Sequence, residues 1–250
     1  MHHIFIGYDD RENEAAQVLK HSIERQAREA VDVRFIKHKE LRDSALFSRP
    51  WRVGETGQTV DERDGRPFST QFSHTRFLVP ELARRAGLGG WVLFMDCDML
   101  MMADVGDLFA LLDDTKALAC VKHRAESIAP TTKMDGMKQL AYRRKLWSSL
   151  LAFNMNHPYN RDLTVDKVNV SAGSWLHALA WAPDDNSIQA LPEGWNWCVG
   201  MSPTTRDADP GLYNIHWTLG GPWMQGYENT MYADAWKKEH KLWLQSRLSS

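Results

Sequence analysis

The chain has 250 residues, of which 43% are hydrophobic and 25% charged, so it is long and apolar enough to bury a full core. Its 30 basic and 32 acidic residues leave a formal net charge of −2, which argues against binding to nucleic acid or anionic lipid through an overall electric field. The three cysteines are widely separated and lack CxxC spacing, which argues against a disulfide framework and against a structural zinc site.

These features favour a reducing, cytoplasmic location. No basic and then apolar signal region precedes the first predicted strand, and no apolar run approaches the roughly 20 residues of a membrane helix. We therefore expect a protein that is neither exported by the classical route nor integral to a membrane.

The first elements predict the start of an α/β sheet. A strand at Ile4–Tyr8 is followed by a helix over about 12–29 and a second strand at Val31–Ile36. This β-α-β order predicts a parallel pair with a right-handed crossover. Gly7 is the only glycine near the first turn. Neither a dinucleotide fingerprint nor a phosphate-binding loop is therefore present, and a bound nucleotide would need another device.

The next segment is predicted as a surface loop over about 42–70, because it is polar and rich in turn residues. A helix is then predicted over Ser73–Ala86, and it leads through a glycine-rich turn into an apolar strand that begins at Trp91. A short helix near Asp104–Phe109 and a strand at Ala117–Val121 follow.

The second half of the chain gives weaker patterns. The stretch 123–145 is basic and irregular, and a solvated surface is its default interpretation. The final helix combines tryptophan and leucine with lysine and arginine, so docking on the core is expected, with weak contact to a membrane-borne acceptor as the alternative. The predicted elements are a strand at Trp147–Phe153, helical structure over Val165–Trp181, a tryptophan-rich segment at Leu191–Cys198, a strand at Tyr213–Trp217 and the helix Tyr232–Leu248.

The most informative feature is a pair of carboxylates, Asp96 and Asp98, at the end of the apolar run that begins at Trp91. Ligands of open α/β sheets gather at the carboxyl ends of the strands. Carboxylates are hard ligands that suit Mg²⁺ or Mn²⁺, which keep other coordination positions for water and substrate phosphates. A solvated strand end is the alternative, because so short a motif recurs by chance.

A second group is His216, near the end of a predicted strand and close to Gly220 and Gly221. A neutral imidazole completes an oxygen-rich Mn²⁺ site, and backbone amides beside glycines can approach phosphate oxygens. A structural or surface role is the commoner fate of a single histidine.

Four sequence blocks resemble those of family-eight glycosyltransferases, the group of glycogenin and the lipooligosaccharide galactosyltransferases. The run VLFMDCDMLMMADVGDLF resembles that family's YLDADxLVxxDLxxLF, and IHWTLGGPW resembles its HFxGxxKPW. The blocks IFIGYDD and SHTRFLVPEL match its first strand and its basic helix, in the family's order. The runs KMDGMKQLAYRRKLWSSLLAFN and LPEGWNW are closer to a bacterial and phage branch of such enzymes.

The resemblance implies a single GT-A domain over 1–250, with a mixed, mostly parallel sheet flanked by helices. Residues 1–110 would bind nucleotide and metal, and residues 111–250 would form the acceptor side and the C-terminal helix. It also implies a metal-dependent transfer, with retention, of a sugar from a nucleotide-diphosphate donor, usually UDP-linked, to an acceptor hydroxyl of a glycan, lipid or other molecule.

The resemblance further implies a set of site residues. Asp96, Asp98 and His216 would bind Mn²⁺ or Mg²⁺. The residues expected to contact the donor are Tyr8, Asp9, Arg76, Asp96, Cys97, Asp98, Gly220 and Gly221. The residues expected near the sugar or the acceptor are Gln139, Tyr142, Lys145, Trp147, Ser148 and Asn196.

The chain departs from the family pattern in two places. The lysine before Pro-Trp is missing, since Gly220-Gly221-Pro222-Trp223 stands there, so Arg76 or Lys145 would have to neutralise the diphosphate. No acid matches the family's residue near the sugar. Asp166, Asn169 and Ser174 are weak substitutes, a core helix is an equal interpretation of their segment, and the catalytic group is unassigned.

Two other functions compete with glycosyl transfer. A sugar nucleotidyltransferase would also use a metal and a diphosphate, but the segment after the first strand is acidic and poor in glycine, which argues against it. A nucleotide-sugar or glycan-binding protein without catalysis would fit the missing lysine. It fits the retained Asp96, Asp98 and His216 less well, because carboxylates gathered without a cation repel each other.

Overall fold

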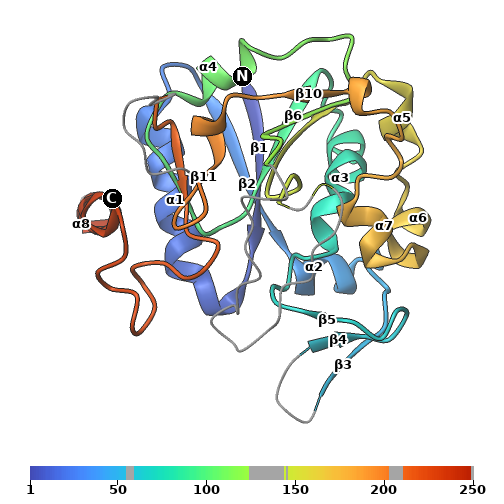
Figure 1. Ribbon diagram of the computed structural model, residues 1–250, viewed down its shortest axis with the longest axis horizontal. Helices are drawn as coiled ribbons and strands as arrows, with labels where there is room; N and C mark the ends of the chain where they lie inside the picture. The colour runs from blue at the N-terminus through green and yellow to red at the C-terminus, as the bar shows by residue number, and fades with distance from the viewer. Residues whose placement is uncertain (55–58, 124–143, 145, 203–210, 249–250) are drawn as a thin grey trace.

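The computed structural model describes residues 1–54, 59–123, 144, 146–202 and 211–248. At its centre is a six-stranded sheet in the order β10-β8-β9-β6-β1-β2 (Figure 1). β9 runs antiparallel to β6 and β8, whereas the other neighbours in this sheet are parallel, so the predicted mixed, mostly parallel sheet is confirmed. The strands are β1 (His2–Tyr8), β2 (Val31–Lys37), β6 (Trp91–Met95), β8 (Leu118–Cys120), β9 (Leu150–Asn154) and β10 (Ile188–Ala190).

Helices cover both faces of this sheet (Figure 1). On one face, α1 (Asn13–Gln26) buries Ala15, Ala16, Leu19 and Ile23, whose spacing places them on one side of a helix. On the other face lie α3 (Val79–Arg85), α5 (Pro158–Arg161), α6 (Val165–Val170) and α7 (Gly173–His177). The short helices α2 (His38–Asp43) and α4 (Val105–Phe109) follow β2 and β7, and α8 (Ala233–Leu248) packs outside α1.

A second, three-stranded sheet lies beside α1. It has the order β11-β12-β7, with β11 at Trp197–Cys198, β12 at Asn214–His216 and β7 at Met99–Met101. β12 runs antiparallel to β7, and His216 pairs with Met99. Because β7 begins directly after the acid pair, this register brings a residue from late in the chain beside Asp98.

The predicted loop over about 42–70 is partly wrong, because it contains a small antiparallel sheet. Its strands are β3 (Trp51–Val53), β4 (Thr59–Asp61) and β5 (Pro67–Phe68). Strands of two or three residues are too short to show a periodic pattern. A buried ion pair anchors this sheet, since Arg49 Nε donates to Asp61 Oδ2 at 2.8 Å.

Other predicted elements exist with different bounds. The helix predicted over Ser73–Ala86 begins as the 3₁₀ helix η2 (Thr75–Leu78) and continues as α3. The helical stretch predicted over Val165–Trp181 is divided into α6 and α7, and the strand predicted from Trp147 begins only at Leu150. The described residues also form the 3₁₀ helices η1 (Asp10–Glu12), η4 (Asp185–Ser187) and η5 (Glu193–Asn196).

The C-terminal helix is held against α1 by buried charge. Glu239 of α8 is 4% exposed, and its carboxylate accepts hydrogen bonds from Arg25 Nε at 2.9 Å and lies 2.7 Å from His21 Nδ1. Trp236 packs beside it in a small cluster with Trp217. The prediction that this helix docks on the core is therefore confirmed.

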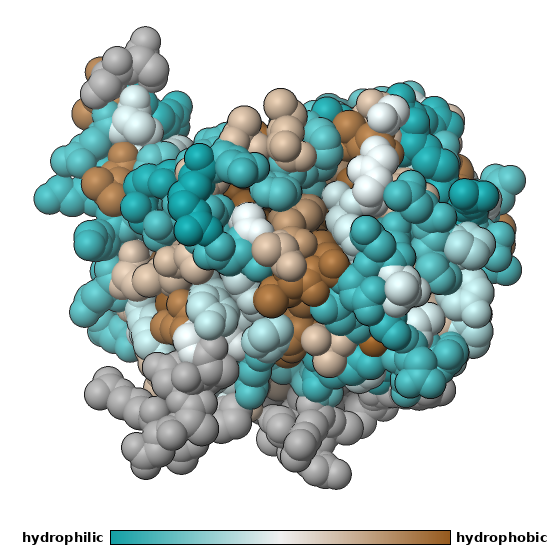
Figure 2. Space-filling model, turned by 90° about the horizontal axis from the view of Figure 1, so that it is seen from above, coloured by the Kyte–Doolittle hydropathy of each residue, from teal (hydrophilic) through white to brown (hydrophobic). Residues whose placement is uncertain are grey.

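In the described part of the chain, no helix has both the length and the apolar character needed to span a membrane. Seen from above, the surface is mostly hydrophilic and has a hydrophobic strip at its centre (Figure 2).

Candidate metal centre

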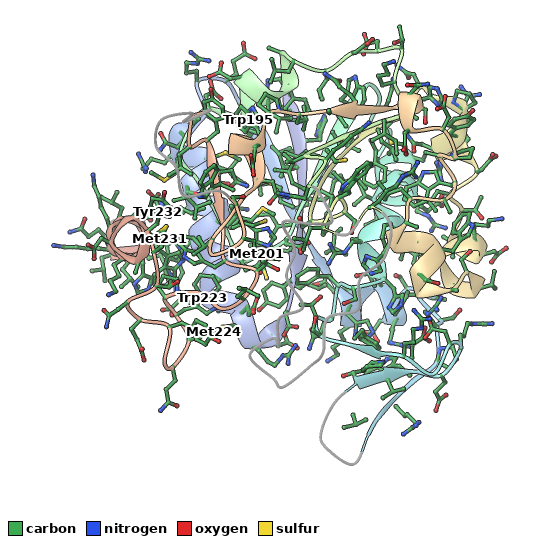
Figure 3. All side chains as sticks on the ribbon, viewed as in Figure 1. Trp195, Met201, Trp223, Met224, Met231 and Tyr232 are labelled. Carbon is green, nitrogen blue, oxygen red and sulfur yellow. The ribbon has the colours of Figure 1, made fainter. Side chains whose placement is uncertain are left out.

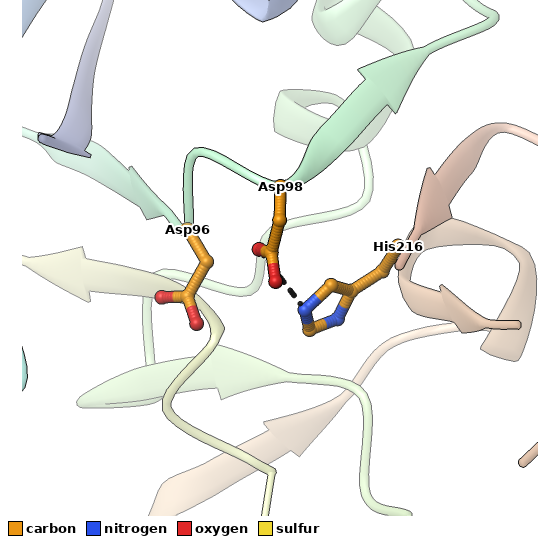
Figure 4. Close-up of side chains that lie close together, drawn as sticks. All are labelled: Asp96, Asp98 and His216. Carbon is orange, nitrogen blue, oxygen red and sulfur yellow. Dashed lines mark ion pairs between the residues drawn. The ribbon is translucent and has the colours of Figure 1, made fainter. Parts of the chain in front are cut away.

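Three ligand-type side chains meet at one end of the central sheet (Figure 4). Asp96 follows β6, Asp98 precedes β7, and His216 ends β12. One ligand atom from each lies within 4.8 Å of the others, and His216 Nε2 is 3.2 Å from Asp98 Oδ1. The structure thus brings together the three residues that the sequence resemblance had grouped.

Backbone hydrogen bonds fix this arrangement. The amide of Asp96 donates to the carbonyl of Ser149 at 2.8 Å, and the amide of Trp217 donates to the carbonyl of Asp98 at 2.9 Å. His216 is 1% exposed, so its ring cannot turn into solvent. The ligands are therefore held by strands and not by loose loop ends.

Charges around the centre are already balanced in part. Arg76 Nη1 lies 2.7 Å from Asp96 Oδ1, and the guanidinium sits over the rings of Phe72 and Phe94 at 5.2 and 5.1 Å. Burial by itself lowers the pKa of His216, but Asp98 and then Cys198 raise it well above its usual value. The pair of acids thus has the Arg76 guanidinium on one side and the His216 ring on the other.

The donor set suits a small, hard divalent cation. Two carboxylate oxygens and one imidazole nitrogen match the ligand preferences of Mn²⁺, and a protein site of three ligands leaves positions for phosphate oxygens. A metal ligand must be a neutral imidazole, so a bound cation would displace the proton from His216 Nε2.

The other predicted donor residues lie around the end of β1. Tyr8 is half-buried, and its hydroxyl donates to Asn13 Oδ1 at 2.9 Å. Asp9 is fully buried, and its oxygens accept from the Arg11 amide and side chain and from the Gln71 amide. Burial would raise the pKa of Asp9, but these hydrogen bonds lower it. Asp9 therefore closes the turn after β1, and its contact with a nucleotide stays a prediction.

Cys97 and the glycines have internal roles. Cys97 is buried and donates its S–H to Glu12 Oε2 at 3.1 Å. The amide of Gly220 donates to the carbonyl of Trp217 at 3.0 Å, so this amide closes a turn. A Cβ atom at Gly221 would lie 2.1 Å from Trp223, and Figure 3 shows Trp223 on the side of the molecule that carries α8.

The structure describes three of the six residues predicted near the sugar or the acceptor, and these three have different surroundings. Ser148 accepts from Arg76 Nη1 through its carbonyl at 2.9 Å, and Trp147 Nε1 donates to the carbonyl of His123 at 3.1 Å. Asn196 is fully buried behind His216, which corrects the prediction that it contacts a sugar, because no ligand can reach it there. The remaining three, Gln139, Tyr142 and Lys145, lie outside the described residues.

The weak catalytic predictions gain no support. Asn169 is buried, and its amide bonds to four backbone groups, accepting from Ser48 and Arg49 and donating to Leu46 and Val165. Asp166 and Ser174 lie on exposed positions of α6 and α7. Asn169 is therefore a structural residue, and the catalytic group stays unassigned.

Sequence reasoning missed two titratable groups beside the centre. Burial and the charge of Asp98 raise the pKa of Glu12 to about 7. Burial would raise the pKa of Cys198, but His216 and His123 lower it to about 6. An acid soon after the first strand was the available signal for Glu12. The position of Cys198 depends on the pairing of β11 with β12, which no local pattern reveals.

No known protein-family model matches the chain. It is 38% identical over 237 residues to Protein CDI of Arabidopsis thaliana, a match that covers 94% of this chain and 85% of the plant protein. The chain belongs to the family of Protein CDI. The proposed closeness to a bacterial and phage branch stays a prediction, since this CDI-family relative comes from a plant.

Solved structures show the fold of this CDI-family chain to be GT-A. The bifunctional glycosyltransferase WbbM matches with a TM-score of 0.61 at 18% identity, covering 96% of this chain and 49% of WbbM. The LgtC mutant Q189E matches with a TM-score of 0.58 at 12% identity, covering 96% of this chain and 95% of LgtC. GlyE of Streptococcus pneumoniae TIGR4 matches with a TM-score of 0.58 at 12% identity, covering 99% of this chain and 63% of GlyE. The predicted fold is thus confirmed.

Proposed function

We propose that the protein is a metal-dependent glycosyltransferase that takes a sugar from a nucleotide-diphosphate donor, UDP-linked, and transfers it to a hydroxyl group with retention. The observation that carries this proposal is the grouping of Asp96, Asp98 and His216 within 4.8 Å, at the end of the sheet, in a GT-A fold. Retention and the uridine nucleotide rest on the resemblance of the sequence blocks to family-eight enzymes.

Asp96, Asp98 and His216 would hold Mn²⁺ or Mg²⁺, which when bound supplies Lewis-acid charge to the leaving diphosphate. The chain's own residues prepare this centre. Arg76 places a guanidinium beside Asp96, and it would take over the role of the missing lysine before Pro222. Arg76 is 6% exposed, so its electrostatic attraction to a nearby phosphate is stronger than at the surface, because few water molecules screen it.

Two routes to retention stay open for this centre. In one, the acceptor hydroxyl attacks on the face of the leaving group, and a phosphate oxygen takes its proton. In the other, a carboxylate or amide of the protein forms a transient adduct with the sugar. Both need the developing negative charge of the nucleotide to be stabilised, which is the part that the described residues can perform.

The test is to incubate the protein with Mn²⁺ and a panel of nucleotide sugars and to measure donor hydrolysis and binding. Wild-type protein should hydrolyse at least one donor, and Asp98→Asn should lower this rate by more than about 100-fold, since a direct ligand matters more than an outer-sphere one. Asp113→Asn, an exposed acid near β8, is the matched control and should behave as wild type.

Other outcomes separate the competing functions. Tight binding of Mn²⁺ and donor without turnover would favour a binding protein of the same fold. Release of pyrophosphate from a nucleoside triphosphate and a sugar phosphate would favour a nucleotidyltransferase. If no nucleotide sugar binds and Asp98→Asn changes nothing, the proposal is wrong.

A further inference from the structure

Behind the metal ligands lies a buried polar chain that the proposed function does not use. Asn196 ends η5, and its side chain touches His216 on the side away from Asp98. Asn196 is fully buried and His216 is 1% exposed. A polar pair at this depth must satisfy its hydrogen bonds within the protein, so its geometry is informative.

The direction of the Asn196 amide is fixed by its neighbours. Ser149 Oγ donates to the carbonyl of Leu146 at 2.8 Å, so the hydroxyl hydrogen is already used. The contact of 2.9 Å between Asn196 Nδ2 and Ser149 Oγ is therefore a hydrogen bond donated by the amide. It follows that the Asn196 oxygen, and not its nitrogen, faces His216 Nδ1 at 2.8 Å.

An amide oxygen only accepts hydrogen bonds, so His216 Nδ1 must carry a hydrogen. In the neutral ring the lone pair then lies on Nε2, the nitrogen that faces Asp98 at 3.2 Å. Ser149 also ties this chain to the other ligand, because its carbonyl accepts from the Asp96 amide at 2.8 Å. Ser149 is thus hydrogen-bonded both to Asn196, which contacts His216, and to the backbone of Asp96.

We infer that Asn196 is a positioning residue, which holds His216 in the Nδ1–H form and directs Nε2 at the cation that Asp96 and Asp98 would share. This inference rests on the metal site of the proposed function. Outer partners of this kind orient a ligating imidazole and raise its basicity, and their loss typically weakens metal binding by about 10- to 100-fold.

The test measures Mn²⁺ affinity directly, by electron paramagnetic resonance of the free ion, in wild type, Asn196→Ala, Asn196→Asp and Asn160→Ala. Asn196→Ala should weaken binding by about 10- to 100-fold. Asn196→Asp keeps an acceptor for Nδ1–H and should bind Mn²⁺ more tightly than Asn196→Ala does. Asn160 is also fully buried and bonds to backbone carbonyls of the central sheet, so Asn160→Ala controls for the loss of a buried amide.

A second readout uses protein labelled with ¹⁵N-histidine, without metal. The His216 signal, assigned by comparison with His216→Gln, should show a slowly exchanging Nδ1–H in wild type that exchanges faster in Asn196→Ala, where Cys198 Sγ at 3.5 Å remains as a weaker acceptor. Thermal unfolding of each variant shows whether it is folded. A merely structural role would destabilise Asn196→Ala and Asn160→Ala alike without a selective change in either readout.

The inference is wrong if Asn196→Ala binds Mn²⁺ as wild type does, or if Asn196→Asp is as weak as Asn196→Ala while both are folded. It is also wrong if wild type shows no Nδ1–H signal. By contrast, intact Mn²⁺ binding with the expected pattern of variants, but without turnover of any nucleotide sugar, would refute the proposed reaction and leave the role of Asn196 standing.

Discussion

Arg76 and Asp96 form a largely enclosed ion pair, with 2.7 Å between Arg76 Nη1 and Asp96 Oδ1 and side chains that are 7% and 13% exposed. The guanidinium also donates to the carbonyl of Ser148 at 2.9 Å. A residue of the helical segment before α3 is thereby joined both to the first acid of the pair and to the segment that precedes β9.

Replacing Arg76 should destabilise the protein. Arg76→Met leaves the partly buried Asp96 without this cation, and breaking one partner of a buried pair costs at most about 3–5 kcal/mol of unfolding free energy. Arg76→Lys keeps the charge but not the forked geometry, so its loss should be smaller. Urea unfolding measures both. Equal stability of Arg76→Met and wild type would contradict a structural role for this pair.

The small sheet of β3, β4 and β5 offers a second prediction. Arg49 and Asp61 are each 1% exposed, so Arg49→Met should lower the free energy of unfolding by about 3–5 kcal/mol. Arg52 lies on the exposed strand β3, and Arg52→Met is the matched control, with a change below about 0.5 kcal/mol. Thermal unfolding compares them. A similar loss in both variants would show that the buried pair is not what anchors this sheet.

His74 should make stability depend on pH. Burial, and then the charge of Arg49, lower its pKa from 6.5 to about 4, although Asp61 lies 3.7 Å away and acts in the opposite direction. Between these two values the unfolded chain binds a proton that the folded protein does not bind. The neutral, buried His74 therefore costs the folded protein no stability above pH 6.5, and the free energy of unfolding decreases as the pH falls from 6.5 towards 4.

The expected slope from this one group is at most about 1.4 kcal/mol per pH unit within that window. The other groups that act on the pKa of His74 are Arg76 and His38, and its ring contacts Phe68 and His177. His74→Gln should remove the slope, measured as the free energy of unfolding in urea from pH 4 to 7. A slope unchanged by this substitution would assign the effect to another group, such as Asp61.

Gly221 is predicted to allow the close approach of Trp223. A Cβ atom there would lie 2.1 Å from the Trp223 ring, so Gly221→Ala must displace the ring at a cost of about 1–3 kcal/mol. The same displacement moves the segment beside His216, so nucleotide-sugar affinity should fall too. Gly89→Ala meets no atom within 4 Å and should leave stability and binding unchanged. Calorimetric unfolding and donor titration give the two quantities.

Sequence patterns predicted the helices and strands that are long enough to show a regular spacing of apolar residues. The strand before Asp96 and the helix that contains Leu19 are such elements, and the order of the blocks placed Asp96, Asp98 and His216 in one site. Their meeting depends on a register between β7 and β12 that spacing alone does not specify.

The missed features depend on contacts between distant segments. Asn196 was predicted to lie near the sugar or the acceptor, but the packing of η5 against β12 buries it behind His216. Asp9 was predicted to contact the donor, which stays a prediction, and the sequence did not reveal that Arg11 and Gln71 donate hydrogen bonds to its oxygens. In both residues the type of side chain was informative, and the direction in which it points was not.

The pairing of Glu239 with Arg25 joins residues that are 214 positions apart in the chain. During synthesis α1 leaves the ribosome long before its partner helix exists. The outer surface of α1, with His21 and Arg25 beside Val18, can therefore be covered only after α8 has been made. Burial of this surface therefore depends on a contact between two helices that more than 200 residues separate, and not on local folding around α1.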